Sequence, residues 1–116
     1  MPNQIEQLNQ VFQALADPTR RAVLKRLCRG PVSTLELAQP FNMALPSFTQ
    51  HLGMLEKSGL VKSKKSGRVR TYELAPKPLQ AAEDWMTNRR ELWERRLDQL
   101  DAHLLTMKEN DDDKGE

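Results

Sequence analysis

A change in hydrophobic periodicity is the feature that most restricts how this chain can fold. Up to residue 58, the apolar residues recur at spacings of three and four, which is the period of a helix. Residues 60–65 and 69–74 instead suit two strands, and Ser66 and Gly67 between them are a hairpin signal. The helical period returns after Pro76. One hairpin set between helical segments predicts a mainly α fold with a small β-hairpin.

The first two predicted helices have recognisable boundaries. The second covers residues 18–29, because Asp17 is a good N-cap and Pro18 is tolerated at the first helical position. Gly30 ends this helix. The first helix covers residues 3–15, and its apolar face consists of Ile5, Leu8, Phe12 and Leu15.

A short third helix and a longer fourth helix follow. Ser33 caps the third helix, and Glu36 three residues later completes a capping-box pattern. The fourth helix begins near Leu45 and ends at Ser58 and Gly59, where the glycine supplies a left-handed closing residue. With the hairpin and a last helix, this order predicts a winged helix-turn-helix fold with five helices and a two-stranded wing. The apolar side of the third helix comprises Leu35, Leu37 and Ala38.

Residues 45–58 have the two faces expected of a recognition helix, the helix that enters the major groove of DNA. At about 100° per residue, apolar and polar side chains separate onto opposite sides. Small and hydrogen-bonding side chains on the polar side allow the helix to approach base edges, and its N-terminus favours phosphate. The core stripe is Leu45, Phe48, Leu52 and Leu55, and the opposite side carries Pro46, Gln50, Gly53 and Lys57, flanked by Ser47, Met54 and Thr49.

The role of this helix leaves two alternatives open. Taken alone, the helix is at least as well explained as an ordinary surface helix with a polar face. The preceding short helix and the following basic hairpin favour DNA binding instead. His51 lies at the boundary of the core, so contact with phosphate and a hydrogen bond within the fold are both consistent with its position. The predicted DNA contacts are Pro46, Ser47, Thr49, Gln50, His51 and Lys57.

The hairpin is strongly basic. Residues 57–77 contain seven Lys and Arg against one acid, Glu73, although the whole chain has a net charge of only +2. Long cationic side chains on a protruding hairpin can contact the phosphate backbone of DNA, and Arg can also enter a narrow minor groove. The alternative is a solvated strand edge that Lys protects from aggregation. The predicted wing contacts are Lys62, Lys64, Arg68 and Arg70.

The last predicted helix, residues 77–108, carries an apolar repeat of seven that is interrupted at Arg90. We interpret it as the interface of a symmetric homodimer, which would present two recognition helices to a pseudo-palindromic site. The alternative is a helix that packs across its own domain. Trp85 and Leu92 lie off the repeat and are expected to pack on the protomer. The seam residues are Met86, Trp93, Leu97, Leu100, Leu104 and Met107.

The length of 116 residues fits one domain, which we place at residues 1–108, with an acidic disordered tail at 109–116. The single cysteine, Cys28, fits a reducing cytoplasm and is interpreted as a small core residue. The chain has no apolar run long enough to span a bilayer and no signal-peptide pattern at its start, so a cytoplasmic location is expected. No phosphate loop, metal-ligand cluster or nucleophile–base spacing indicates an enzyme.

Five segments together resemble the arsenic-repressor (ArsR) family of bacterial regulators: residues 16–24, 35–38, 47–52, 55–61 and 67–72. The resemblance implies a dimeric repressor of transcription whose first and last helices form the dimer interface, which adds Leu8 and Phe12 to it. It also implies that Arg68 and Arg70 match the wing of the family. The part of the recognition helix that contacts DNA in the family is matched by Ser47, Thr49, Gln50 and His51.

The metal sensing of that family is not expected here. Its thiolate sensors place a cysteine pair on the third helix, where this chain has Leu35-Glu36-Leu37-Ala38. Asp101 and His103 supply only half of the ligand pattern that other members carry on the last helix, so no metal and no cofactor are predicted. A second hypothesis, argued against by the basic hairpin, is a winged-helix protein-interaction module that does not read DNA specifically.

Overall fold

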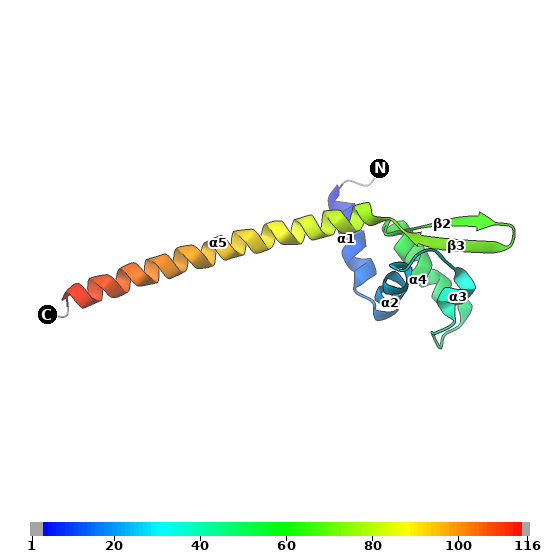
Figure 1. Cartoon of the computed structure of the whole chain (residues 1–116), viewed down its shortest axis with the longest axis horizontal. Helices are drawn as coiled ribbons and strands as arrows, with labels where there is room; N and C mark the ends of the chain where they lie inside the picture. Colours follow the sequence, from blue (N-terminus) through cyan, green and yellow to red (C-terminus); the bar gives the residue numbers. More distant parts are fainter. Residues whose placement is uncertain (1–3, 115–116) are drawn as a thin grey trace. The chain divides into compact units, whose positions relative to one another are not determined.

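The computed structural model describes residues 4–114, and for 111–114 the backbone alone. It confirms the winged helix-turn-helix fold class: four helices precede a hairpin, and a long helix follows it (Figure 1). The elements are α1 (Gln4–Leu15), α2 (Pro18–Leu27), β1 (Val32–Ser33), α3 (Thr34–Ala38), α4 (Leu45–Lys57), β2 (Val61–Ser66), β3 (Val69–Leu74) and α5 (Pro76–Lys114).

The sheet has one strand more than the sequence predicts. β1 pairs antiparallel with β3, which gives the order β1-β3-β2, and Val32 lies opposite Tyr72. Because β1 is only two residues long, it cannot show the alternation by which a strand is recognised in a sequence. The wing, formed by β2 and β3, is therefore part of a three-stranded sheet. β1 joins this sheet directly to the start of α3.

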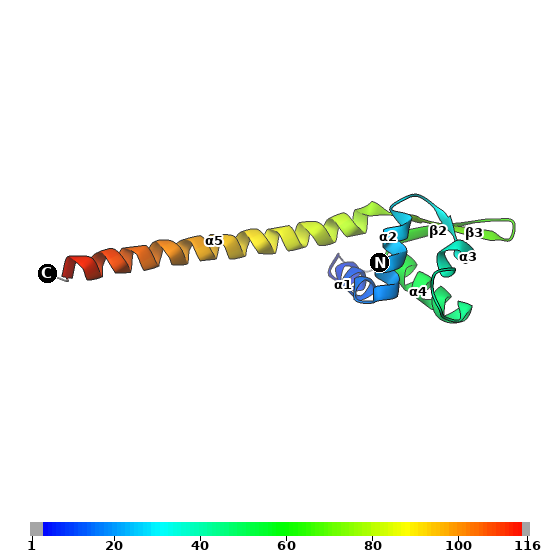
Figure 2. The ribbon, with the colours of Figure 1, turned by 60° about the horizontal axis from the view of Figure 1, so that its bottom comes forward.

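The chain divides into two compact units, residues 1–82 and residues 83–116. The first unit contains the core, to which α1, α2, α3, α4, the sheet and residues 76–82 of α5 contribute buried side chains; Figure 2 shows the ribbon of these elements. The described part of the second unit, residues 83–114, is a single helix. The limits predicted for one domain, residues 1–108, stay a prediction. The largest fully buried side chains of the core are Phe48, Leu37, Leu52, Leu55, Leu60, Val11 and Val23.

The helix caps form as the sequence predicts. The Asp17 carboxylate accepts a hydrogen bond from the backbone N–H of Arg20 at 3.0 Å, and the Ser33 hydroxyl accepts one from the backbone N–H of Glu36 at 3.3 Å. Gly59 has φ of 82°, and a Cβ there would lie 3.1 Å from Cγ of Pro78. Both the backbone angle and the close packing therefore require glycine at the end of α4.

Several residues expected in the core are exposed instead. Leu45 is 46% exposed and Leu35 is 72% exposed, and Ile5 and Cys28 are also on the surface. Periodicity gives the direction of a side chain and not the presence of a neighbour that covers it. α3 has only five residues, so of the described apolar positions on it only Leu37 is fully buried.

The last helix is longer than predicted. α5 continues to Lys114, so residues 109–114 are helical where the sequence predicts a disordered tail, and residues 115–116 lie outside the described part. Once a helix is nucleated, each further residue adds a hydrogen bond at little cost, which the local polar composition does not reveal. Among residues 4–114 no helix is both long and apolar enough to cross a membrane.

Candidate nucleic-acid interface

α3, a turn and α4 form the helix-turn-helix. Aromatic packing fixes the turn, because the rings of Phe41 and Phe48 lie with their centroids 5.3 Å apart. The backbone N–H of Phe41 donates to the carbonyl of Ala38 at 3.0 Å, which closes the end of α3. α4 then begins after Ala44, and no side chain caps its first turn. The N-terminus of α4 is thus left with free backbone N–H groups.

The two faces of α4 separate clearly. Phe48, Leu52 and Leu55 are fully buried, and the hydroxyl of buried Ser58 donates to the carbonyl of Leu55 at 2.7 Å. The opposite side is exposed, and we call it the recognition face. The structure brings together on one exposed surface the predicted contacts Pro46, Gln50 and Lys57, with Gly53 among them. The recognition face comprises Pro46, Gln50, Gly53 and Lys57.

Thr49 and Ser47 flank this face and differ in what they can offer a ligand. The Thr49 hydroxyl donates to the carbonyl of Leu45 at 2.7 Å, with a second contact of 3.1 Å to the carbonyl of Pro46. This back-bonding engages its only donor, so toward a base edge Thr49 is left with acceptor capacity and its methyl group. Ser47 is exposed.

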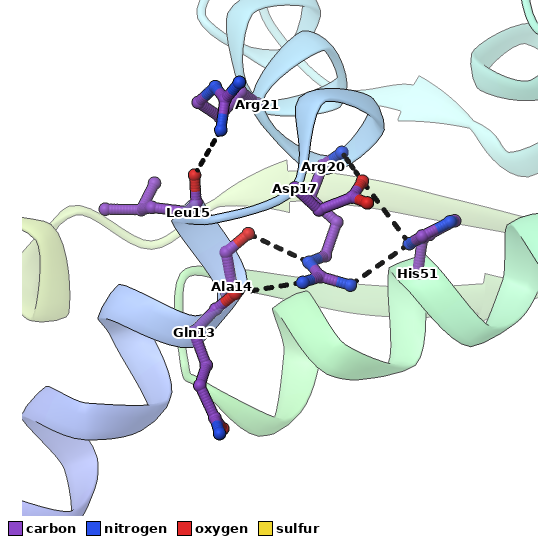
Figure 3. Close-up of polar contacts among 7 residues, drawn as sticks. All are labelled: Gln13, Ala14, Leu15, Asp17, Arg20, Arg21 and His51. Carbon is purple, nitrogen blue, oxygen red and sulfur yellow. Dashed lines mark hydrogen bonds and ion pairs between the residues drawn. The ribbon is translucent and has the colours of Figure 1, made fainter.

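His51 belongs to a polar cluster that ties α4 to the start of α2 (Figure 3). Nη1 of Arg20 lies 3.2 Å from Nδ1 of His51, and Oδ2 of Asp17 lies 3.6 Å from the same nitrogen. Because a guanidinium group only donates, Nδ1 of His51 accepts in its contact with Nη1 of Arg20. The sequence left two roles open for His51, and the hydrogen bond within the fold is formed.

Arg20 is the centre of this cluster. Its Nε donates to the carbonyl of Ala14 and its Nη2 to the carbonyl of Gln13, both at 2.9 Å, so it closes the C-terminal end of α1 (Figure 3). The backbone N–H of Arg20 holds the pKa of the Asp17 carboxyl below its usual value of 3.8, and partial burial opposes this shift. One guanidinium therefore joins α1, α2 and α4.

The wing presents its cations on two faces of the sheet. Lys65 lies opposite Arg70 in register, on the same side as the buried Tyr72 and the helices, whereas Lys64 lies opposite Thr71 on the other side. Lys62 and Lys64 line an open hollow of about 430 Å³ with Thr71 and Glu73. The sequence-based set omitted Lys65, although alternation along β2 would have placed it on the face of Arg70.

A chain of side chains links the recognition helix to the wing. The Ser63 hydroxyl on β2 donates to the carboxylate of Glu56 on α4, and Nη1 of Arg70 donates to the Ser63 hydroxyl at 2.7 Å. Thr34 at the start of α3 donates to the backbone carbonyl of Arg70 at 3.2 Å. Arg70 thus positions the wing as well as carrying its charge. The seven-residue spacing from Glu56 to Ser63 and on to Arg70 gives no sequence signal for such a link.

Comparison with known proteins identifies the family. A family model for a helix-turn-helix domain matches residues 15–64. A crystal structure of an ArsR family transcriptional regulator is similar at 56% identity, with a TM-score of 0.76, and the match covers 81% of this chain and 97% of that one. The chain belongs to the ArsR family. This ArsR-family chain is also 35% identical to the transcriptional repressor SdpR of Bacillus subtilis over 81 residues, 70% of its own length and 90% of that protein.

A second curated relative agrees with this assignment. The transcriptional regulator Rv2034 of Mycobacterium tuberculosis is 41% identical over 73 residues, which is 63% of this chain and 68% of that protein. The ArsR-family chain is accordingly a DNA-binding transcriptional regulator and not an enzyme. Within the part of the chain that the structure describes, no three His, Cys, Asp or Glu side chains gather as metal ligands would.

Proposed function

We propose that this regulator represses transcription as a symmetric homodimer, with each protomer reading one half of an inverted repeat in double-stranded DNA. α4 enters the major groove with its recognition face, and the basic wing contacts the backbone or the minor groove. The observation that carries this proposal is the recognition face of α4, all four residues of which are exposed, together with the basic hairpin that follows α4.

The recognition helix supports the proposal with two kinds of group. Gln50 offers an amide that can pair with an adenine edge through two hydrogen bonds, and Ser47 can pair with several bases. The uncapped first turn of α4 offers backbone N–H groups to a phosphate. His51 has Nε2–H left for a phosphate, because its Nδ1 is engaged by Arg20. The N-terminal half of α4 thus combines base contacts with backbone contacts.

The wing supplies charge at a distance from α4. Its tip projects past α3 and α4 in both views (Figure 1, Figure 2), and Arg68 lies beside the turn. Arg68, Lys62 and Lys64 are exposed and can follow the phosphate backbone. The guanidinium of Arg70 already donates a hydrogen bond to Ser63, so we assign Arg70 a smaller part in binding DNA than the other wing cations.

The proposal of a homodimer rests on apolar side chains that the described chain leaves exposed. On residues 83–110 of α5 the seam is 42% exposed at Leu97 and 60% exposed at Trp93. Trp85 and Leu92 are expected from the sequence to pack on the protomer, but they are 41% and 44% exposed. Their exposure therefore does not differ from that of the seam residues as predicted. On α1, Leu8 and Phe12 are partly buried against the core. A seam of this kind favours a partner helix, since exposing it to water is costly.

The decisive experiment is footprinting of the purified chain on the DNA upstream of its own reading frame. We expect protection of two half-sites separated by about 34–36 Å, one turn of the duplex or a multiple of it. Binding should weaken steeply as salt is raised, because counterions are released from the neutralised phosphates. Equal affinity for this DNA and for random DNA at moderate salt would reject specific reading and favour the protein-interaction module instead.

A further inference from the structure

Gly53 occupies the centre of the recognition face and has no explanation within the fold. It lies one turn after Gln50 and one turn before Lys57, in the interior of α4. Glycine is a poor residue for such a position, because it loses more backbone freedom than alanine when a helix forms. A helix that keeps glycine at an interior position therefore needs a reason for it.

Neither backbone conformation nor packing within the chain provides that reason. The glycines with positive φ are Gly30, Gly59 and Gly67, so Gly53 adopts a conformation open to any residue. A Cβ built at Gly53 meets no other atom within 4 Å, whereas one at Gly59 would crowd Pro78. Alanine would therefore fit at Gly53 and would favour the helix.

The surroundings of Gly53 indicate what approaches it. Gln50 and Lys57 are exposed, and neither side chain makes a hydrogen bond or an ion pair within the described residues. The amide of Gln50 can bond to base edges, and the cation of Lys57 can bind phosphate. A surface that offers both groups on either side of an exposed backbone is complementary to DNA. Hydrocarbon or an apolar protein surface would leave both side chains unsatisfied.

We propose that Gly53 is the point of closest approach between α4 and DNA, and that its missing Cβ sets how deeply the helix enters the major groove. A methyl group at this position would hold the helix back by a bond length of roughly 1.5 Å. Gln50 would then lose its hydrogen-bond geometry to the bases, since such bonds weaken steeply beyond their normal lengths. This inference rests on the proposed function, because it needs α4 to face DNA.

The test separates folding from binding with the variant Gly53→Ala. We expect its midpoint of thermal unfolding to rise by a few degrees, because alanine favours the helix and meets no obstacle. Its affinity for the protected DNA should fall at least tenfold. Asn88→Ala is the matched control: it also improves helix propensity at an exposed helical position, but on α5 instead of α4. This control should keep wild-type affinity.

Each other outcome overturns the inference in a recognisable way. If wild-type protein binds the protected DNA and Gly53→Ala binds equally well, closest approach at Gly53 is wrong while the proposed function stands. If Gly53→Ala unfolds at a lower temperature than wild type, the glycine serves the fold. If wild-type protein shows no specific binding, the proposed function and this inference fall together.

Discussion

Asp17, Arg20 and His51 show how single residues hold the recognition helix in place. The Arg20 guanidinium bonds the end of α1 and Nδ1 of His51, and its backbone N–H bonds the Asp17 carboxylate. Asp17 and His51 are both partly exposed, with side chains 27% and 24% accessible. These bonds therefore act as positioning contacts at the edge of the core, and the bond that the Asp17 carboxylate accepts is strengthened by its charge.

Loss of this carboxylate should have a pH-dependent cost. Asp17→Ala is expected to lower the free energy of unfolding by about 1 kcal/mol at neutral pH, the usual value of an N-cap. The pKa of Asp17 is lowered in the folded chain, so its contribution is complete above pH 3.8 and disappears as pH falls through the folded pKa. Urea unfolding of the wild type and of Asp17→Ala, at pH 7 and at the lowest pH where the fold persists, measures the difference in free energy of unfolding at each pH.

The control for this prediction is Asp17→Asn, which keeps a capping oxygen and removes the charge. It should be less destabilising than alanine at pH 7, and its stability should lack the acid-dependent loss assigned to the carboxylate. A deficit for Asp17→Ala that stays constant down to acid pH would contradict the assigned role of the ionised form.

Gln50 is the residue from which we expect sequence selectivity. Gln50→Ala should reduce discrimination at one base pair of each half-site by about 1–3 kcal/mol, because it removes a bidentate contact to a base edge. Competition binding with a set of single-base operator variants measures this. Lys57→Ala provides the comparison, since loss of a cation should weaken all sequences alike. Unchanged discrimination by Gln50→Ala would remove Gln50 from the reading set.

At the scale of elements, the wing and the recognition helix behave as a linked pair. Glu56 on α4, Ser63 on β2 and Arg70 on β3 form a continuous chain of hydrogen bonds. Burial raises the pKa of the Tyr72 phenol in the same sheet, so this hydroxyl stays neutral at physiological pH. The wing is thus tied to α4 through Ser63, while Arg68 at its tip is exposed.

Arg68 at the tip should contribute to affinity without selectivity. Arg68→Ala is expected to weaken binding to operator and random DNA by a similar factor. The slope of log affinity against log salt should become shallower by about 1.8, because the variant loses one phosphate contact in each of the two protomers, at about 0.9 per contact. Binding measured over a range of salt concentrations gives both quantities.

Lys25→Ala is the matched control, because it removes one exposed positive charge from α2, outside the proposed interface. It should leave the salt slope nearly unchanged. If Lys25→Ala and Arg68→Ala lower the slope equally, the effect reports the overall charge of the chain and the wing has no special contact.

At the scale of the whole molecule, the chain combines a compact unit with a long helix. Residues 1–82 hold the core, and residues 83–110 hold a repeat of exposed apolar side chains. A monomer would leave this repeat in water. The proposal of a homodimer therefore concerns the second unit above all, where the exposed side chains recur at the spacing of a helical seam.

A charge placed in that seam should separate the protomers. Leu97→Glu is expected to give the mass of one chain by size-exclusion chromatography with light scattering, where the wild-type chain gives the mass of two. Operator affinity should fall by at least tenfold because the two half-sites are no longer bound together. Gln99→Glu introduces the same charge off the seam and should stay dimeric. A monomeric wild-type chain would contradict the homodimer.

The sequence by itself determined the order of the five helices and of the hairpin formed by β2 and β3. Asp17 and Ser33 cap α2 and α3 as predicted, and Gly59 ends α4. These residues act on the backbone within one helical turn, so a few consecutive residues of sequence are enough to recognise them. The core stripe of α4 was predicted correctly at Phe48 and Leu52 for the same reason, since helical period is a local property.

Only the tertiary structure decided which groups meet across the chain. The partner of His51 lies 31 residues away at Arg20, and the exposure of Leu45 depends on what lies over the first turn of α4. The two-residue β1 exists through its pairing with β3, and the division of the wing cations between two faces follows from register. These features depend on contacts distant in sequence, for which a local pattern carries no information.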